Sequence, residues 1–384
     1  MTGRDLSVYI HIPFCAVRCG YCDFNTYTAT ELGGGGSQRE YPDNAMAEMD
    51  LTLAEDRAAG HVYDQVSTVF FGGGTPTLLP AGELVAMLDH LRGLIPLAED
   101  AEVTTEANPD SVTCESLQTL ADGGITRISF GMQSAVRSVL ATLNRTHDPE
   151  RVPQAVAWAK EAGLQVSLDL IYGTPGETLA DVETSVRSAL DCGIDHLSAY
   201  SLIIEGNTAM ARQLRRGELE APDPDDMADK YEVVEQLATA DGLGWYEVSN
   251  WARSPQHRSQ HNLAYWRGKD WWGIGPGAHR HRVGMRAWNV KHPSRYARML
   301  AEGSLPRQES EQLGETEREL ERVMLGLRIV EGLRLADVPE RNRDQVGVHL
   351  DRGHLDPDAA ADGRLVLTLP GRLLADAVIR DLVI

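Results

Sequence analysis

Short apolar runs alternate with longer segments of helical periodicity along the first half of the chain, and this alternation restricts the possible folds most strongly. Six runs predict strands: Leu6–Ile12, Val66–Phe71, Ala101–Thr105, Thr126–Gly131, Gln165–Ile171 and His196–Ile203. Amphipathic stretches between them predict helices, including Ala81–Leu94, Pro149–Ala162 and Leu179–Cys192. Nearly continuous apolar strands joined through helices form a parallel sheet covered by helices. We therefore expect an α/β fold, an incomplete (β/α)6 barrel that is open on one side.

The rest of the chain predicts two smaller parts. We expect the barrel to occupy residues 1–240, an extension to occupy 241–305 and a small C-terminal α+β domain to occupy 306–384. The polar, charged stretch Glu302–Glu317 marks the second boundary. Beyond it, Arg318–Val330 and Gly371–Val383 predict helices and Arg364–Leu369 predicts a short strand. A winged-helix-like arrangement is one that fits this pattern.

Most of the unusual polar residues and glycines stand where a predicted strand ends. In chain order these are Cys15, Cys19 and Cys22 after the first strand, Gly72–Pro76 after the second, Glu106 at the end of the third, Gln133 after the fourth and Asp169 late in the fifth. In parallel barrels the functional groups gather at the carboxyl ends of the strands. We therefore expect these residues to meet at one rim.

The cysteines of the run HIPFCAVRCGYCDFN have a CxxxCxxC spacing. A 4Fe–4S cluster has four irons, each of which takes one ligand, so three thiolates leave one iron open to a small molecule. A zinc site is the alternative, but it would need a second cysteine pair or histidines, and only His11 lies nearby. The other two cysteines, Cys114 and Cys192, stand alone in helical segments and are interpreted as ordinary thiols. The spacing thus favours a cluster.

Composition excludes several classes of function. The formal charge of −21, from 57 acidic and 36 basic residues, argues against a nucleic acid as main partner. No run approaches the roughly 20 apolar residues of a membrane span, and no secretory signal pattern is present. Few cysteines, clustered as metal ligands, fit a reducing compartment. We expect a cytoplasmic protein without a transmembrane segment.

One segment is basic although the chain is acidic. No Asp or Glu occurs between Trp271 and Ala301, where Arg280, Arg282, Arg286, Lys291, Arg295 and Arg298 all fall. Such a segment favours a small anionic ligand or a specific acidic partner, and a solvated cationic face is the alternative.

Several longer motifs support a resemblance to a known family. They are YIHIPFC, FFGGGTPT, SFGMQS, LNRTH, LDLIYGTPGE, HNLAYW and GIGPGAH, and they extend over nearly the whole chain. With the cysteine spacing, they resemble the radical SAM superfamily and, within it, the oxygen-independent coproporphyrinogen III oxidase family with its branch of HemW-type haem chaperones. The resemblance implies that S-adenosylmethionine (SAM) chelates the open iron through its amino and carboxylate groups.

The resemblance also assigns roles to single residues. It implies that Tyr9 and Tyr21 flank the cluster and SAM, that Gly73, Gly74 and Thr75 contact the methionine part, and that Glu106, Gln133, Arg145 and Asp169 complete the SAM site. These roles are physically reasonable, because carboxylates accept hydrogen bonds from ribose hydroxyls and an arginine pairs with a carboxylate.

Three features favour the chaperone branch over the oxidases. The oxidases carry a further cysteine two residues after the third, where this chain has Phe24, and a longer segment before the cluster. HNLAYW, residues 261–266, matches a motif of the chaperone branch. We therefore expect a haem chaperone that passes haem to acceptor haemoproteins, membrane-associated respiratory ones among them, with no coproporphyrinogen oxidase activity. The alternative is an oxidase that decarboxylates propionates, and whether SAM is cleaved is left open. A radical SAM enzyme that modifies nucleic acid is disfavoured by the acidic charge.

The same region predicts where haem would bind. His261 is the expected axial ligand, with His11, His279 and His281 as competitors. Five of the seven tryptophans lie near the motif and could form aromatic walls: Trp245, Trp251, Trp266, Trp271 and Trp272. The basic segment could meet the two propionates.

Overall fold

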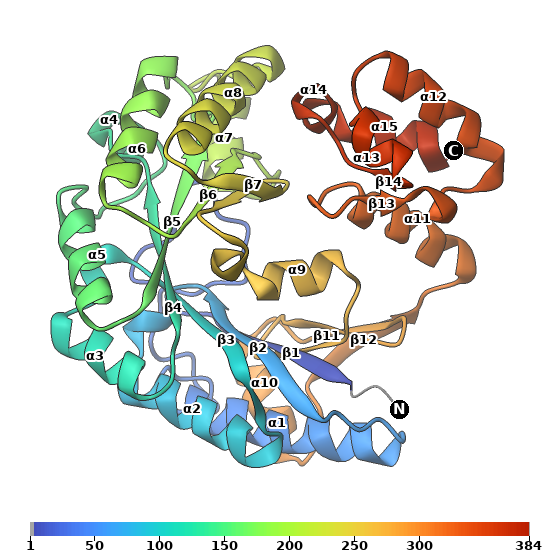
Figure 1. The fold of residues 1–384 in the computed structure, drawn as a ribbon. Helices are drawn as coiled ribbons and strands as arrows, with labels where there is room; N and C mark the ends of the chain where they lie inside the picture. The colour runs from blue at the N-terminus through green and yellow to red at the C-terminus, as the bar shows by residue number, and fades with distance from the viewer. Residues whose placement is uncertain (1–3, 384) are drawn as a thin grey trace.

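The computed structural model describes residues 4–383 (Figure 1). All six predicted strands are present, and β1 to β6 pair in parallel in chain order. Their bounds are β1 (Asp5–Ile12), β2 (Gln65–Gly73), β3 (Leu97–Ala107), β4 (Arg127–Gln133), β5 (Gln165–Tyr172) and β6 (His196–Ser201). The expected incomplete barrel of parallel strands is confirmed.

Helices cover the outer face of these strands (Figure 1). They are α1 (Tyr41–Ala58), α2 (Ala81–Leu94), α3 (Cys114–Asp122), α4 (Arg137–Thr142), α5 (Arg151–Glu161), α6 (Leu179–Asp191), α7 (Ala209–Arg215) and α8 (Pro224–Ala240), with short 3-10 turns η1 (Pro76–Leu78) and η2 (Pro109–Ser111). Threonine side chains fix where two helices begin, because Thr113 and Thr178 form capping boxes with the third residue of α3 and α6. No helix within residues 4–383 is both long enough and apolar enough to cross a membrane.

The sheet continues beyond the barrel at both edges. At the β1 edge, β9 (Trp271–Ile274) runs parallel to β1 and is followed by antiparallel β10 (His279–Arg282), β11 (Met285–Asn289) and β12 (Arg307–Gln312). At the β6 edge lie antiparallel β8 (Asn250–Ala252) and β7 (Gly244–Glu247). The connecting helices are η3 (Pro255–His257), α9 (Gln260–Trp266) and α10 (Pro293–Ala301). The strands β7 to β12, between residues 244 and 312, are thus part of the barrel's own sheet. The domain boundaries at 240 and 305 stay predictions.

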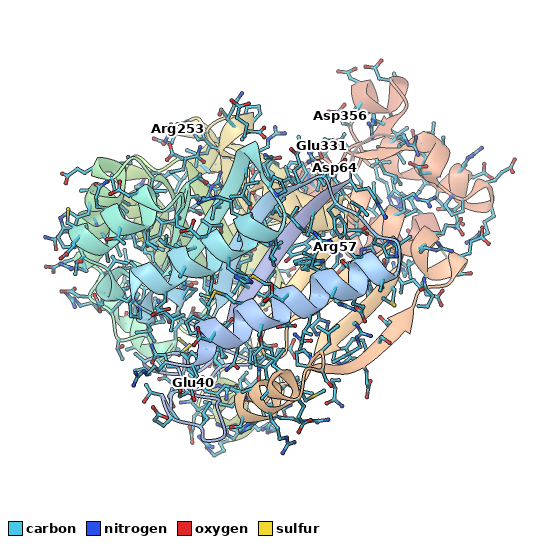
Figure 2. All side chains as sticks on the ribbon, turned by 90° about the horizontal axis from the view of Figure 1, so that it is seen from below. Glu40, Arg57, Asp64, Arg253, Glu331 and Asp356 are labelled. Atoms are coloured by element: carbon cyan, nitrogen blue, oxygen red, sulfur yellow. The ribbon has the colours of Figure 1, made fainter. Side chains whose placement is uncertain are left out.

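Acidic residues of α1 neutralise two of the six cations of the basic segment. In Figure 2, α1 runs between the labelled Glu40 and Arg57, and its last turns carry Glu55 and Asp56. Arg280 pairs with Glu55, and Arg282 pairs with Asp56, whose side chain is 2% exposed. The expectation that Arg280 and Arg282 face an anionic ligand or solvent is therefore wrong. These arginines attach the β10–β11 hairpin to α1.

The C-terminal part has a hydrophobic core of its own, built around Val323, Leu327, Leu365 and Leu382. Its elements are α11 (Glu315–Gly326), β13 (Leu333–Arg334), η4 (Leu335–Asp337), η5 (Glu340–Asn342), α12 (Arg343–Asp351), α13 (Pro357–Ala361), β14 (Arg364–Leu365), α14 (Leu369–Leu373) and α15 (Ala375–Val383). The predicted strand at 364–369 ends after two residues, because Thr368 caps α14. The winged-helix-like arrangement stays a prediction.

Candidate functional site

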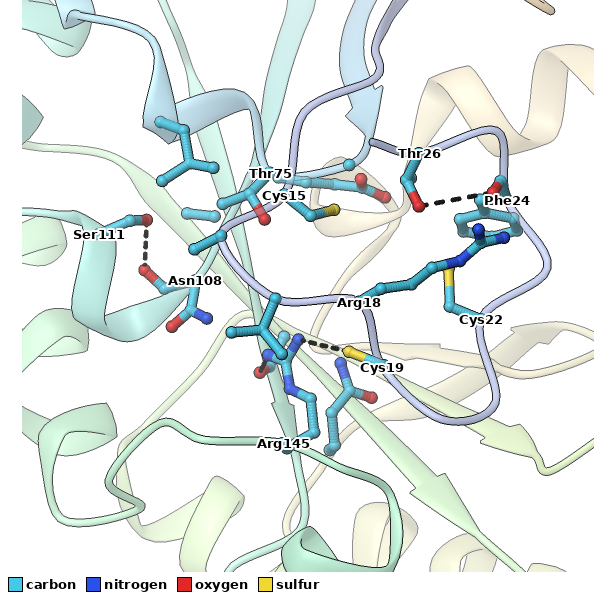
Figure 3. Close-up of a pocket in the computed structure, with 18 of the residues that line it drawn as sticks. Cys15, Arg18, Cys19, Cys22, Phe24, Thr26, Thr75, Asn108, Ser111 and Arg145 are labelled. Atoms are coloured by element: carbon cyan, nitrogen blue, oxygen red, sulfur yellow. Dashed lines mark hydrogen bonds between the residues drawn. The ribbon is translucent and has the colours of Figure 1, made fainter. Parts of the chain in front are cut away.

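Most of the predicted site residues line one cavity of about 380 Å³ at the carboxyl ends of β1 to β5, here called the rim pocket (Figure 3). The predicted residues in its wall are Cys15, Cys19, Tyr21, Cys22, Gly73, Gly74, Thr75, Glu106, Gln133, Arg145 and Asp169. The parallel strands bring these residues together from the carboxyl-terminal parts of β2 to β5 and from the loops that follow β1, β2 and β4, as expected. Asn108, Ser111, Ser129 and Asn144 also line the pocket and were not predicted as site residues. Ser129 and Asn144 lie within the motifs SFGMQS and LNRTH, which was the one signal that could have identified them.

The three cysteines lie on the loop after β1, and their side chains reach the same pocket (Figure 3). Backbone bonds hold this loop: Cys15 N donates to the Tyr27 carbonyl (2.9 Å), and Gly20 N to that of Leu143 (3.1 Å). Within residues 4–383, no group of three His, Cys, Asp or Glu side chains is compact enough for a single metal ion. The three thiols line one opening, as the ligands of a single iron–sulfur cluster would.

Burial favours the thiol form of two of the cysteines, Cys15 and Cys22. Burial raises the pKa of Cys15 to about 11, although a hydrogen bond with Thr75 partly opposes the shift. Burial likewise raises the pKa of Cys22. A thiolate is the metal ligand, so the positive charge of bound iron has to displace these protons.

The glycines after β2 allow the backbone of two strands to approach closely. Gly74 N donates to the Ile12 carbonyl (2.8 Å), and Thr75 N donates to the Phe14 carbonyl (2.7 Å). A Cβ on Gly74 would lie 2.4 Å from the Phe14 oxygen. Gly73 has φ +105°, where side chains are strained. Only glycine can therefore hold this turn beside the cysteine loop.

Two carboxylates, those of Glu106 and Asp169, line the pocket. Glu106 accepts a hydrogen bond from Gly73 N (2.9 Å), and Asp169 accepts from the Ser129 hydroxyl at 3.0 and 2.9 Å. Burial and the nearby Asp169 raise the pKa of Glu106 to about 7. Burial raises the pKa of Asp169 to about 6, against the opposing hydrogen bonds from serines. Such carboxylates favour a ligand that is cationic or donates hydrogen bonds.

Arg145 offers a positive charge at the opposite side of the pocket from the glycine turn. Its Nη2 donates to the Gly131 carbonyl (2.6 Å), and its Nη1 lies 3.6 Å from the Cys19 sulfur. Its Nε is buried without a hydrogen-bond partner among the described residues. The neighbouring Asn144 and Gln133 have φ of 56° and 63°, a backbone conformation that is costly for residues other than glycine. An unpartnered buried donor beside the cysteines fits a ligand with a carboxylate.

Tyr9 and His261 lie outside the rim pocket. The Tyr9 hydroxyl is 3.0 Å from His11 Nδ1. His261 is 1% exposed, and both of its ring nitrogens are hydrogen-bonded, Nδ1 to the Thr68 hydroxyl (2.8 Å) and Nε2 to the Tyr265 hydroxyl (2.9 Å). Burial lowers the pKa of His261 to about 3, so the ring is neutral. Tyr9, which was predicted to flank the cluster and SAM, is therefore not in the wall that holds the cysteines. Its role there and the role of His261 as a haem ligand stay predictions.

A second cavity, of about 460 Å³, lies between β9, β10 and α11 and is here called the aromatic pocket. Phe24, Tyr265, Trp271, His279 and His281 are in its wall. Of the five tryptophans near the motif, Trp271 alone lines this pocket. Trp251 and Trp272 are buried and donate to Glu235 and Asp56 instead.

Comparisons with known proteins agree with this arrangement. The model of the Radical SAM superfamily matches residues 9–189. Heme chaperone HemW of Mycobacterium tuberculosis (strain ATCC 25618 / H37Rv) is 49% identical over 383 residues, which cover 100% of this chain and 96% of that protein. Heme chaperone HemW of Bacillus subtilis (strain 168) is 34% identical, with 97% of each chain covered. Among solved structures, coproporphyrinogen III oxidase (HemN) of Escherichia coli, a radical SAM enzyme, superposes with a TM-score of 0.82 at 22% identity, over 99% of this chain and 90% of that one, and shows that the fold is shared.

Proposed function

The chain belongs to the family of the heme chaperone HemW, a branch of the radical SAM superfamily, and on this premise we propose that it binds haem and passes it to acceptor haemoproteins. The observation that carries the proposal is the identity of 49% with a heme chaperone over the whole chain. The rim pocket supports it, because cysteines, glycine turn, carboxylates and Arg145 have the chemistry that a cluster and SAM require.

Different residues of the rim pocket would bind different parts of these cofactors. Cys15, Cys19 and Cys22 would hold a 4Fe–4S cluster, which when bound supplies an open iron and an electron donor. Arg145 would pair with the SAM carboxylate through its unpartnered donor. Glu106 and Asp169 would accept hydrogen bonds from the ligand's hydroxyl or ammonium groups.

Phe24 argues against the oxidase alternative. It stands where the family's oxidases carry a further cysteine, and its side chain is 58% exposed at the mouth of the rim pocket. We therefore expect no coproporphyrinogen oxidase activity.

A further cavity supports a second candidate activity. A chamber of about 450 Å³ inside the barrel shares Glu106 and Asp169 with the rim pocket. Buried Arg127 lines it, with Nε and Nη1 unpartnered among the described residues, although its Nη2 lies 3.4 Å from Glu102. Such a chamber would accept an acidic molecule beside SAM, so SAM cleavage on a substrate other than coproporphyrinogen is the second candidate function.

The proposal names the acceptors of haem only as a class of proteins. We expect haemoproteins, including membrane-associated respiratory ones, and a cytoplasmic site of action, since five free cysteines fit a reducing compartment.

Haem transfer is the test. Protein reconstituted with iron and sulfide under anaerobic conditions is loaded with haem and mixed with a tagged, haem-free acceptor haemoprotein. Haem should appear in the acceptor faster than serum albumin, a passive scavenger, removes it from the same donor. Equal rates for acceptor and scavenger would show passive release and contradict the proposal.

A further inference from the structure

We propose that haem binds in the aromatic pocket and that Nε2 of His281 is its axial iron ligand, an inference that rests on the proposed haem-binding function. An iron ligand needs an accessible nitrogen with a free lone pair. His261 offers none in this structure, because it is 1% exposed and hydroxyl groups occupy both ring nitrogens. Iron could reach it only after one of these bonds had broken.

His281 meets both requirements. It lies on β10 with its side chain partly exposed in the aromatic pocket. Its Nδ1 lies 3.3 Å from the Lys269 carbonyl, which can only accept, so Nδ1 carries the proton and Nε2 carries the lone pair. Within residues 4–383, Nε2 of His281 makes no hydrogen bond. A histidine whose other nitrogen donates to a backbone carbonyl is the usual arrangement of a metal ligand.

A chain of aromatic contacts connects His281 to the HNLAYW motif. The His281 ring packs on Trp271 with centroids 4.9 Å apart, and Trp271 packs edge-on against Tyr265 at 4.8 Å. The Tyr265 hydroxyl is in turn bonded to His261. His261 is therefore a positioning residue, which fixes the wall of the pocket without touching the iron.

His279 is the nearest competitor, because residues two apart on a strand face the same side. The His279 ring is stacked on Trp288 with centroids 5.6 Å apart, whereas the His281 ring packs on Trp271. His279 also has no hydrogen bond from a ring nitrogen to orient it among the described residues.

The pocket also suits the size and charge of haem. A volume of about 460 Å³ lies within the range of small-molecule sites and would hold a flat ligand in part, as release to an acceptor requires. Arg286 supplies a cation for a propionate, although Glu321 of α11 pairs with it at 2.5 Å. Phe24 lines both this pocket and the rim pocket, so bound haem would lie just beyond Phe24 from the cysteine loop.

Ferric haem titration of the reconstituted protein, followed by the Soret band and by electron paramagnetic resonance, tests the assignment. His281→Ala should weaken haem binding by roughly 10-fold or more. Loss of a residue that only supports a metal ligand already weakens metal binding about 10- to 100-fold, and loss of the ligand itself should cost at least as much. The same substitution should also abolish the spectrum of histidine ligation. In His281→Gly, added imidazole should restore that spectrum, which separates loss of the ligand from loss of the fold. His90→Ala is the matched control, because His90 lies on α2 and pairs with Asp50; its affinity and spectrum should equal those of the wild type.

The outcomes separate this inference from the proposed function. His261→Ala should retain the ligation spectrum and bind haem more weakly, since it removes the support of Tyr265 and the partner of the Thr68 hydroxyl but leaves the proposed iron ligand in place. If His281→Ala binds haem with unaltered affinity and spectrum while His261→Ala or His279→Ala loses ligation, the assignment is wrong and the proposed function stands. If the wild-type protein binds no haem, both are overturned.

Discussion

Replacing Arg145 by Met tests the rim pocket as a SAM site. Arg145 follows α4, and its guanidinium points at Cys19 with one nitrogen left unpartnered (Figure 3). Methionine has a similar length without the charge, so the substitution removes the proposed partner of the SAM carboxylate. The glycine turn and the carboxylates remain in place.

The size of the effect follows from the contact that is lost. A hydrogen bond to a charged group contributes about 1.5–3 kcal/mol net, and about 1.4 kcal/mol corresponds to a factor of ten. Arg145→Met should therefore weaken SAM binding roughly 10- to 140-fold. Arg137→Met is the matched control, because Arg137 begins α4, its side chain is 64% exposed, and it pairs with Asp148 on the surface. We expect the control to stay within about twofold of wild type.

Equilibrium dialysis of labelled SAM against the reconstituted proteins measures both affinities, with iron and sulfide content determined on the same samples. Arg145 lies 3.6 Å from a cysteine sulfur, so iron content has to be equal for the comparison to hold. If Arg145→Met carries full iron and binds SAM as tightly as wild type, Arg145 does not hold the carboxylate.

Three further predictions concern the cluster, the fold and pH. Replacing any one of the three loop cysteines by Ala should abolish cluster reconstitution, measured by iron analysis, whereas Cys114→Ala should retain full iron because Cys114 is exposed on α3. Arg282→Met leaves the buried Asp56 without its ion partner and should lower the free energy of unfolding in urea by about 3–5 kcal/mol, against about 0.5 kcal/mol or less for Arg187→Met in an exposed pair. The raised pKa of Glu106 stabilises the ligand-free fold below the group's ordinary pKa, and this contribution is lost as pH rises through about 7. Glu106→Gln should therefore reduce the fall in Tm with rising pH; an unchanged fall would show that Glu106 is not the group responsible.

The barrel and its rim could be predicted because each depends on local pattern. Apolar runs and amphipathic helices identify parallel strands, and parallel strands end at one edge. The sequence pattern could thus group Cys15, Glu106 and Asp169 at one rim, although 154 positions separate the first of them from the last (169 − 15). Polar residues such as Ser129 could not be predicted as site residues, because the role of Ser129 depends on Asp169, which only the fold brings beside it.

The basic segment shows why charge patterns mislead. Arg280 and its partner Glu55 are 225 residues apart, so the neutralising charge is invisible in the local sequence. The same limit applies to His261. Its motif indicates importance, but burial and the hydroxyls of Thr68 and Tyr265 come from tertiary packing, and only the structure shows that His281 has the free nitrogen.

The central claim is that this radical SAM scaffold carries haem and does not make its precursor. The most direct measurement incubates the reconstituted, reduced protein with SAM in two parallel reactions, one with haem and one with coproporphyrinogen III, and analyses the tetrapyrroles by chromatography. Our account predicts haem bound to the protein and recovered chemically unchanged, and coproporphyrinogen III left intact. Conversion of coproporphyrinogen III to protoporphyrinogen IX, dependent on SAM and without haem binding, would contradict it.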